Sequence, residues 1–497
     1  MRRPAHRHGF LLVTGIARTT NALSQAKIER MTQAPPDPDR LRALIATLEA
    51  GLLERGAAAR LVLLSALAGE HVLLIGPPGT AKSELARRLH RAFDGARYFE
   101  RLLTRFSTPE ELFGPLSLKA LEDDRYERLT DGYLPTASVA FLDEVFKANS
   151  AILNALLTLL NEREFDNGSG RARTPLVSVI GASNEVPAEE ALLAFYDRFL
   201  VRVPVGPVSD ASFGALLELP PPQAGQPLVA ARPLTRAEVG AWLAERNAVQ
   251  LPADVLEHLQ RLREHLREAQ TPASDRRWRQ LVGLLRTAAF TEGRTQVDAF
   301  DLWLVPYTLA AQPAQAVGLH AWFVEHVARA TPQDAAWLER AVQAFEKQLE
   351  IEAGASADDS DATAATAGKI ALARSIGGAQ DETMTRLMTQ ALEAHSRKRY
   401  SSVHIGARSA QVDELRQRLR TQHAELLAHS RALREALQGR LWLPPELAAC
   451  LWGGVDATCA RLRGLLERLD ATHAGFAALP LNERLTGEAP EPVAIAA

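Results

Sequence analysis

A glycine-rich loop with one lysine and one hydroxyl side chain, GPPGTAKS, occupies residues 76–83. Backbone N–H groups of such a loop can surround phosphates, the lysine can neutralise the terminal phosphates, and the hydroxyl can bind Mg²⁺. The loop lies between a strand-like run and a helix-like run, so the positive end of the helix faces the phosphates. Ala81 departs from the general pattern, which has glycine before the lysine. We therefore predict a site for ATP and Mg²⁺ formed by Gly76, Pro77, Pro78, Gly79, Thr80, Ala81, Lys82 and Ser83.

A pair of carboxylates ends an apolar run at residues 143 and 144, with the aspartate 61 residues after Lys82. Asp143 can hold Mg²⁺ through water, together with Ser83, and Glu144 can orient attacking water or accept its proton. An Asp-Glu pair alone is also common at helix starts, so the prediction depends on its place at the end of an apolar strand. We predict that Asp143 and Glu144 are catalytic.

Polar side chains farther along the chain can complete this chemistry. Asn184 follows the next strand, where its amide can position water between the acid pair and the γ-phosphate. Arg198 ends a helix, and in a ring it could reach the γ-phosphate of a neighbouring subunit; a salt bridge with Asp197 is the structural alternative. Arg276 begins a later helix and could close on the phosphates of its own subunit. Arg277 beside it is the competing candidate for that role.

Apolar runs and helical patterns alternate around these residues. Short apolar runs are typical of buried parallel strands, and helices between them predict an α/β fold with a parallel sheet covered on both faces. We predict strands at 71–75, 97–104, 138–143, 177–184 and 200–205, and helices at 39–69, 83–93, 151–162 and 191–199.

Beyond a proline-rich break near residues 219–227 the pattern becomes purely helical, with two long helices at 410–440 and 445–474. Residues 354–368 are small, acidic and poorly hydrophobic, which is typical of a flexible linker. We predict a disordered extension at 1–38, an α/β core at 39–206, an all-α lid at 207–330, a helical C-terminal domain at 331–480 with a flexible insert at about 351–408, and a disordered tail at 481–497.

Composition limits the classes of function. The formal net charge of −3 provides no global basic field that would favour DNA or an anionic membrane. The two cysteines, Cys450 and Cys459, are too few for a disulfide framework, which favours a cytoplasmic protein. No stretch approaches the roughly 20 apolar residues that span a bilayer. The start of the chain faintly resembles a signal peptide, but a disordered extension is the simpler interpretation.

The nucleotide-site elements, in this order, resemble those of AAA+ ATPases. More specifically, the chain resembles the MoxR family in TRFSTPEELFGPLS, GYLPTASVAFLDEVFKA, LLTLLNEREF and ASNE. This resemblance spans roughly residues 40–310 and implies an AAA+ P-loop sheet, a helical lid and an insert at 114–134. Alanine before the lysine is usual in that family. The SDRRW motif and the helical C-terminal region are similar to the regulatory ATPase variant A (RavA) subfamily.

The MoxR resemblance implies a ring, expected to be a homo-hexamer, with ATP sites between subunits. It also implies chaperone-like work on partner proteins, with a von Willebrand factor type A domain protein as the usual partner. In RavA a β-rich domain inserted in the C-terminal region docks a lysine decarboxylase. Residues 351–408 here are short, rich in Ala, Ser and Asp, and lack alternating β patterning, which puts lysine decarboxylase binding in doubt.

Two other functions would use the same nucleotide site. A metal-chelatase-like motor subunit, similar to the magnesium chelatase small subunit, shares the insert. A nucleic-acid translocase or regulator is the second alternative, but the net charge and the lack of an evident basic groove count against it. The leading interpretation is a MoxR-type ATPase that remodels or activates other proteins.

Overall fold

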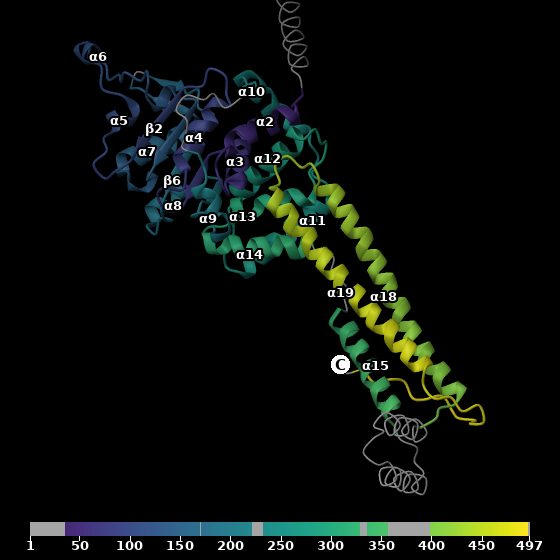
Figure 1. Ribbon diagram of the computed structural model, residues 1–497. Helices are drawn as coiled ribbons and strands as arrows, with labels where there is room; N and C mark the ends of the chain where they lie inside the picture. Colours follow the sequence, from purple (N-terminus) through teal and green to yellow (C-terminus); the bar gives the residue numbers. More distant parts are fainter. Residues whose placement is uncertain (1–34, 169, 221–231, 329–334, 356–397, 496–497) are drawn as a thin grey trace, which may run out of the picture. The chain divides into compact units, whose positions relative to one another are not determined.

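A computed structural model describes residues 35–168, 170–220, 232–328, 335–355 and 398–495. The chain divides into two compact units (Figure 1). The first comprises the chain up to Ala328 together with Leu437–Ala448, and the second comprises Arg329–Ala436 and Ala449–Ala497. Most of the expected N-terminal extension, and the expected linker from residue 356 onward, lie outside the described residues.

A parallel sheet of five strands forms the centre of the first unit, in the order β2-β3-β6-β1-β7. Every neighbouring pair is parallel, which confirms the predicted fold class. The carboxyl ends of all five strands therefore meet at one edge of the sheet, where ligands of open α/β sheets bind. The strands are β1 (Val72–Ile75), β2 (Tyr98–Leu102), β3 (Val139–Asp143), β6 (Ser178–Ser183) and β7 (Val201–Pro204).

The three central strands β1, β3 and β6 are buried on both faces, because successive residues point to opposite sides of the sheet and almost all of them are buried. The edge strand β2 is exposed at Glu100, Arg101 and Leu102. On one face, Leu73 and Leu142 share a core with Ile152 and Phe195 of the helices α7 (Ser150–Glu162) and α8 (Glu190–Tyr196). The other face packs against α3 (Gly56–Ala68) and α4 (Lys82–Arg91). Figure 1 shows these helices around the strands.

Helices follow the sheet along the chain, as predicted. The structure also contains elements that we did not predict, namely the antiparallel hairpin of β4 (Glu164–Asp166) and β5 (Arg171–Arg173) and the short helix α9 (Asp210–Leu217). Within the expected insert lies α6 (Leu118–Glu122). The other helices before and after the sheet are α2 (Pro38–Glu49), α10 (Arg236–Glu245), α11 (Ala253–Glu268), α12 (Asp275–Thr291), η4 (Ala299–Leu304), α13 (Val305–Leu309) and α14 (Pro313–Phe323).

The second unit is helical and contains α15 (Ala335–Gly354) with most of α18 (Ser402–Leu437) and α19 (Pro445–Ala477). This confirms the predicted helical C-terminal region. Glu352 fixes part of its core, accepting a hydrogen bond from Arg408 Nε at 2.9 Å. In the C-terminal tail, where we expected disorder, the Glu491 carbonyl accepts a bond from Arg408 at 2.7 Å. Within the described ranges, no helix combines the length and apolar character that crossing a membrane requires.

Candidate nucleotide site

The glycine-rich loop leaves the carboxyl edge of the sheet directly after β1. The Gly76 N–H donates to the Ser183 carbonyl at 3.0 Å, and Val205 N–H donates to the Ile75 carbonyl at 2.7 Å. A Cβ added at Gly76 would lie 2.0 Å from the Val205 carbonyl oxygen, so only glycine allows this close approach. The sheet therefore fixes the start of the loop from both neighbouring strands.

Lys82 begins α4 and turns its side chain back into the loop. Its ammonium donates to the carbonyls of Gly76 at 2.5 Å and Pro77 at 2.8 Å, and the residue is 7% exposed. Burial lowers the pKa of Lys82, while the nearby carboxylates of Asp143 and Glu144 act to raise it. The loop thus holds a cation in a partly desolvated position beside the acid pair, as binding of terminal phosphates requires.

Ala81, the departure noted in the sequence, has a left-handed backbone with φ of 66°. This conformation favours glycine, because a Cβ raises its energy by roughly 1–2 kcal/mol. The structure therefore shows why the general pattern has glycine here. It also shows that the loop of this chain keeps the same turn with an alanine.

The predicted acid pair and asparagine come together at the carboxyl ends of β3 and β6. Asn184 Nδ2 donates to Glu144 Oε1 at 2.6 Å, and the other carboxylate oxygen lies 3.2 Å from Lys147 Nζ. The Glu144 backbone is left-handed, with φ of 52°, and its N–H donates to Asp143 Oδ1 at 3.0 Å. Glu144 is thus oriented through both of its oxygens, and Lys147 is a partner that the sequence pattern did not reveal.

The oxygen donors near the loop fit Mg²⁺. Ser83 is in the first turn of α4, and Asp143, whose charge acts on the Lys82 ammonium, ends β3. Hydroxyl and carboxylate oxygens are the donors that Mg²⁺ prefers, usually together with substrate phosphates and water. The described residues contain no group of three or more His, Cys, Asp or Glu side chains that could hold a metal ion without such help.

Arg55 supports the loop from outside and was not identified from the sequence. Its guanidinium donates to the Thr80 carbonyl at 3.2 Å and to the Gly206 carbonyl at 2.6 Å. The residue is 6% exposed, and burial lowers its pKa. Arg55 therefore ties the phosphate loop to the segment that follows β7, a long-range contact that no local pattern signals.

Arg198 lies at the opposite edge of the sheet, just before β7 begins. The alternative salt bridge with Asp197 does not form; Asp197 instead pairs with Arg277 at 2.9 Å and with Arg202 at 3.6 Å. The Arg198 side chain is partly exposed, and its Nε is buried without a hydrogen-bond partner. The structure thus leaves the Arg198 guanidinium outside the ion-pair network around Asp197.

Arg277 and Arg276 are distinguished by burial. Arg277 is 4% exposed and donates to the carbonyls of Leu200 and Thr308, which makes it a structural residue that fixes α12 beside β7. Arg276 is exposed and donates to Asn161 Oδ1 at 3.1 Å. It also lies close enough to Glu70, just before β1, to affect the pKa of that carboxyl. Arg276 is therefore at the amino edge, away from the phosphate loop of its own subunit.

Glu70 occupies an unusual position at this amino edge. It lines a cavity of about 860 Å³ together with Arg163 and Arg246, and it accepts a hydrogen bond from Gln280 at 2.8 Å. Burial raises the pKa of Glu70 to about 7, although Arg246, Gln280 and Arg163 act in the opposite direction. This cavity lies across the sheet from the phosphate loop, so it is separate from the nucleotide site.

Comparison with known proteins agrees with this arrangement. The family described as "MoxR domain in the MoxR-vWA-beta-propeller ternary systems" matches residues 39–239, and an AAA lid domain family matches residues 254–323. An uncharacterized protein of Methanocaldococcus jannaschii, MJ0812, is 40% identical over 268 residues, which are 54% of this chain and 70% of that protein. The chain belongs to the MoxR family of AAA+ ATPases.

Two further relatives match a smaller share of the chain. A second M. jannaschii protein, the uncharacterized MJ0079, is 43% identical over 257 residues, covering 51% of this chain and 66% of that protein. Protein MoxR of Paracoccus denitrificans is 31% identical over 173 residues, which are 33% of this chain and 50% of that protein. The chain thus spans about half to two thirds of the length of these relatives.

Proposed function

We propose that this MoxR-family protein hydrolyses ATP. Lys82 would hold the terminal phosphate oxygens, and Ser83 and Asp143 would hold Mg²⁺, which neutralises developing charge on the phosphates. Glu144 would accept the proton of the attacking water. Asn184 orients Glu144 through a bond of 2.6 Å, the observation that most directly supports a catalytic rather than a purely structural acid pair.

We also propose that the sites are completed between subunits of a ring. Arg198 and Arg276 are both at the amino edge of the sheet, whereas Lys82, Glu144 and Asn184 are at the carboxyl edge. In this arrangement neither arginine reaches the phosphates bound by its own subunit. Each could instead reach the γ-phosphate of a neighbouring subunit, as an arginine supplied in trans does in other nucleotide hydrolases. This replaces the expected same-subunit role of Arg276 with a role in trans.

The work of the ring, in this proposal, is to remodel or activate partner proteins in a chaperone-like manner. The matched family description names a vWA protein, so a von Willebrand factor type A domain protein is the proposed partner. A hexamer is the proposed ring. The helical second unit and the SDRRW motif at the start of α12 support placement near the RavA subfamily.

Two substitutions test the ATPase assignment. Lys82→Ala removes the buried cation of the loop, so we expect loss of ATP binding in a fluorescent-nucleotide titration. Glu144→Gln retains the hydrogen-bonding shape but removes the base, so ATP should bind normally while kcat falls by roughly 10²–10⁴-fold. Tight ATP binding by Lys82→Ala, or unchanged turnover by Glu144→Gln, would overturn the assignment.

The partner class is tested by what stimulates hydrolysis. A von Willebrand factor type A domain protein from the same genome should raise kcat of the wild-type chain and leave Glu144→Gln inactive. Capture on immobilised Glu144→Gln with ATP would identify the client. Stimulation by DNA, with no response to the von Willebrand factor type A domain protein, would favour the nucleic-acid alternative instead.

A further inference from the structure

The segment Leu437–Ala448 belongs to the nucleotide-binding unit, although the chain on both sides of it belongs to the helical unit. It contains the end of α18, the connecting turn and the first residues of α19. We call this segment the clasp. Two helices of 36 and 33 residues thus enter and leave the AAA+ unit through twelve residues. The contacts of the clasp within the AAA+ unit therefore determine which movements of that unit can reach the two helices.

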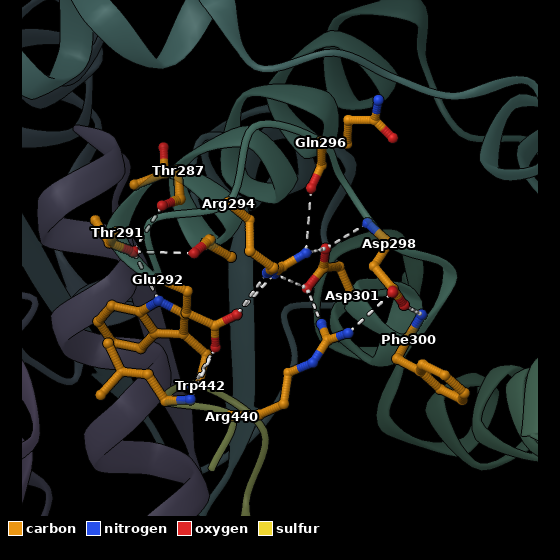
Figure 2. A network of polar contacts seen from close by, with 12 residues as sticks. Thr287, Thr291, Glu292, Arg294, Gln296, Asp298, Phe300, Asp301, Arg440 and Trp442 are labelled. Carbon is orange, nitrogen blue, oxygen red and sulfur yellow. Dashed lines mark hydrogen bonds and ion pairs between the residues drawn. The ribbon is translucent and has the colours of Figure 1, made fainter. Parts of the chain in front are cut away.

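Trp442 is the buried centre of the clasp, with 1% of its surface exposed. Its Nε1–H donates to Thr291 Oγ1 at 2.8 Å, and its backbone N–H and that of Leu441 donate to Glu292 Oε1 at 3.3 and 2.8 Å (Figure 2). Thr291 ends the lid helix α12, and Glu292 is its C-cap residue. The tryptophan therefore joins the clasp to the carboxyl end of the main lid helix.

Arg440 joins the clasp to the next part of the lid. Its guanidinium lies 3.0 Å from Asp298 Oδ2 and 3.1 Å from Asp301 Oδ1, and the Arg440 side chain is 10% exposed. Asp301 is also held by Arg294, with bonds of 2.7 and 2.8 Å (Figure 2). Both aspartates belong to the capping box of η4. Charged bonds buried to this degree are costly to break, because each partner would be left desolvated.

The clasp also contacts the helices that lead into the phosphate loop. Arg60 of α3 donates to the Leu441 carbonyl at 3.3 Å, and Arg42 of α2 donates to the Gly439 carbonyl at 2.9 Å. The α3 helix packs against β1, whose end forms the start of the loop. These core contacts are two hydrogen bonds to backbone carbonyls, a long one from Arg60 and one from the half-exposed Arg42. The lid contacts are a buried indole and a charged network, so the clasp is bound more firmly to the lid than to the core.

From these contacts we infer that the clasp moves with the lid and passes nucleotide-dependent lid movement to α18 and α19. This inference rests on the proposed ATPase function and adds to it that the lid shifts against the core between nucleotide states. A packed helix pair shifts as a body rather than bending locally. A displacement of α12 must therefore either carry the clasp along or break its buried bonds, and the bonds to Arg42 and Arg60 are the ones that can rearrange. The helical unit would thereby report the nucleotide state to a bound partner.

Amide hydrogen exchange on the full chain tests this coupling. In the Glu144→Gln background, adding ATP should slow exchange in the peptide that covers the phosphate loop. It should also change exchange in the clasp and in the turns of α18 and α19 that adjoin it. Arg440→Met should keep the first response and lose the second. Asp301 retains Arg294 as its partner, so this variant leaves no unpaired buried carboxylate.

Two further variants complete the experiment. Trp442→Ala should lose the helix response in the same way, while Trp442→Phe, which keeps a buried ring, should lose less of it. The matched control is Arg468→Met, which removes an ion pair of 2.6 Å with Glu346 inside the helical unit and should leave both responses intact.

Other results of the exchange experiment would contradict either the coupling alone or the ATPase proposal as well. If the phosphate loop responds but α18 and α19 do not respond in the parent, the coupling is overturned and the ATPase proposal stands. The coupling is also overturned if Arg440→Met and Trp442→Ala keep the full helix response. A phosphate loop that does not respond to ATP would overturn the ATPase proposal and the coupling together.

Discussion

Two residues of the nucleotide site have strained backbone conformations. Ala81 and Glu144 are both left-handed without being glycine, with φ of 66° and 52°. Such strain persists at functional sites because the surrounding structure holds it in place. The left-handed turn at Ala81 brings Lys82 back toward the loop carbonyls. The turn at Glu144 presents the carboxylate to Asn184.

Replacing Ala81 with glycine should relieve this strain. Glycine adopts the left-handed conformation freely but loses more entropy on folding, so the free energy of unfolding should rise by at most about 1 kcal/mol. Urea unfolding measures the stability, and a nucleotide titration should show affinity within about twofold of the parent. A clear loss of stability would mean that the φ of Ala81 carries no strain.

Arg55 is expected to act on nucleotide affinity rather than on the chemical step. Arg55→Met removes the bonds to Thr80 and Gly206 but touches none of the predicted catalytic groups. Loss of a charge-assisted bond of about 1.5–3 kcal/mol corresponds to roughly a ten- to hundredfold rise in the Kd for ATP. The control is Arg87→Met on α4, which removes a half-exposed ion pair with Glu100. A fall in kcat with unchanged Kd would assign Arg55 a different role.

At the scale of elements, the start of β1 and the lid helix α12 meet around one buried carboxyl. Gln280 of α12 donates to Glu70, whose pKa is raised to about 7 by burial. The folded state therefore binds a proton more tightly than the unfolded state, for which the pKa is 4.5. Ionisation of Glu70 therefore lowers the free energy of unfolding. This loss is absent below pH 4.5, grows between pH 4.5 and 7, and is complete above pH 7.

Glu70→Gln should remove this pH dependence. The raised pKa corresponds to about 3 kcal/mol above pH 7, so the variant should gain stability over the parent at pH 8 and little at pH 5. Thermal unfolding at both pH values measures the difference. An equal effect of the substitution at pH 5 and pH 8 would show that Glu70 is charged in the folded state throughout.

The elements differ in how far the sequence could predict them. The strands that carry Asp143 and Asn184 were predictable because apolar runs of strand length alternate with helices, and parallel strands bring their carboxyl ends together. The β4–β5 hairpin was not, because its strands are three residues long and largely charged. No local pattern indicates the role of Trp442, because its hydrogen-bond partner Thr291 is 151 positions away in the sequence.

Local sequence patterns also could not predict at which edge of the sheet Arg276 lies. Its place depends on how α12 packs, and the buried Arg277 and Gln280 of the same helix fix α12 at the amino edge. The sequence identified the basic residue but not the edge of the sheet that it faces. We therefore propose that Arg276 acts on the site of a neighbouring subunit, in place of the expected role in its own subunit.

For the whole molecule, we propose a site shared between subunits, in which one subunit supplies Lys82 and Glu144 and the next supplies Arg198. Mixing two inactive variants tests it. Arg198→Ala keeps the phosphate loop and Glu144, and Glu144→Gln keeps Arg198, so each alone should hydrolyse ATP very slowly. Randomly mixed rings with equal parts of both should recover about a quarter of wild-type turnover, because that fraction of neighbouring pairs is complete. A mixture that stays at the sum of the two variants measured alone would contradict the intersubunit site.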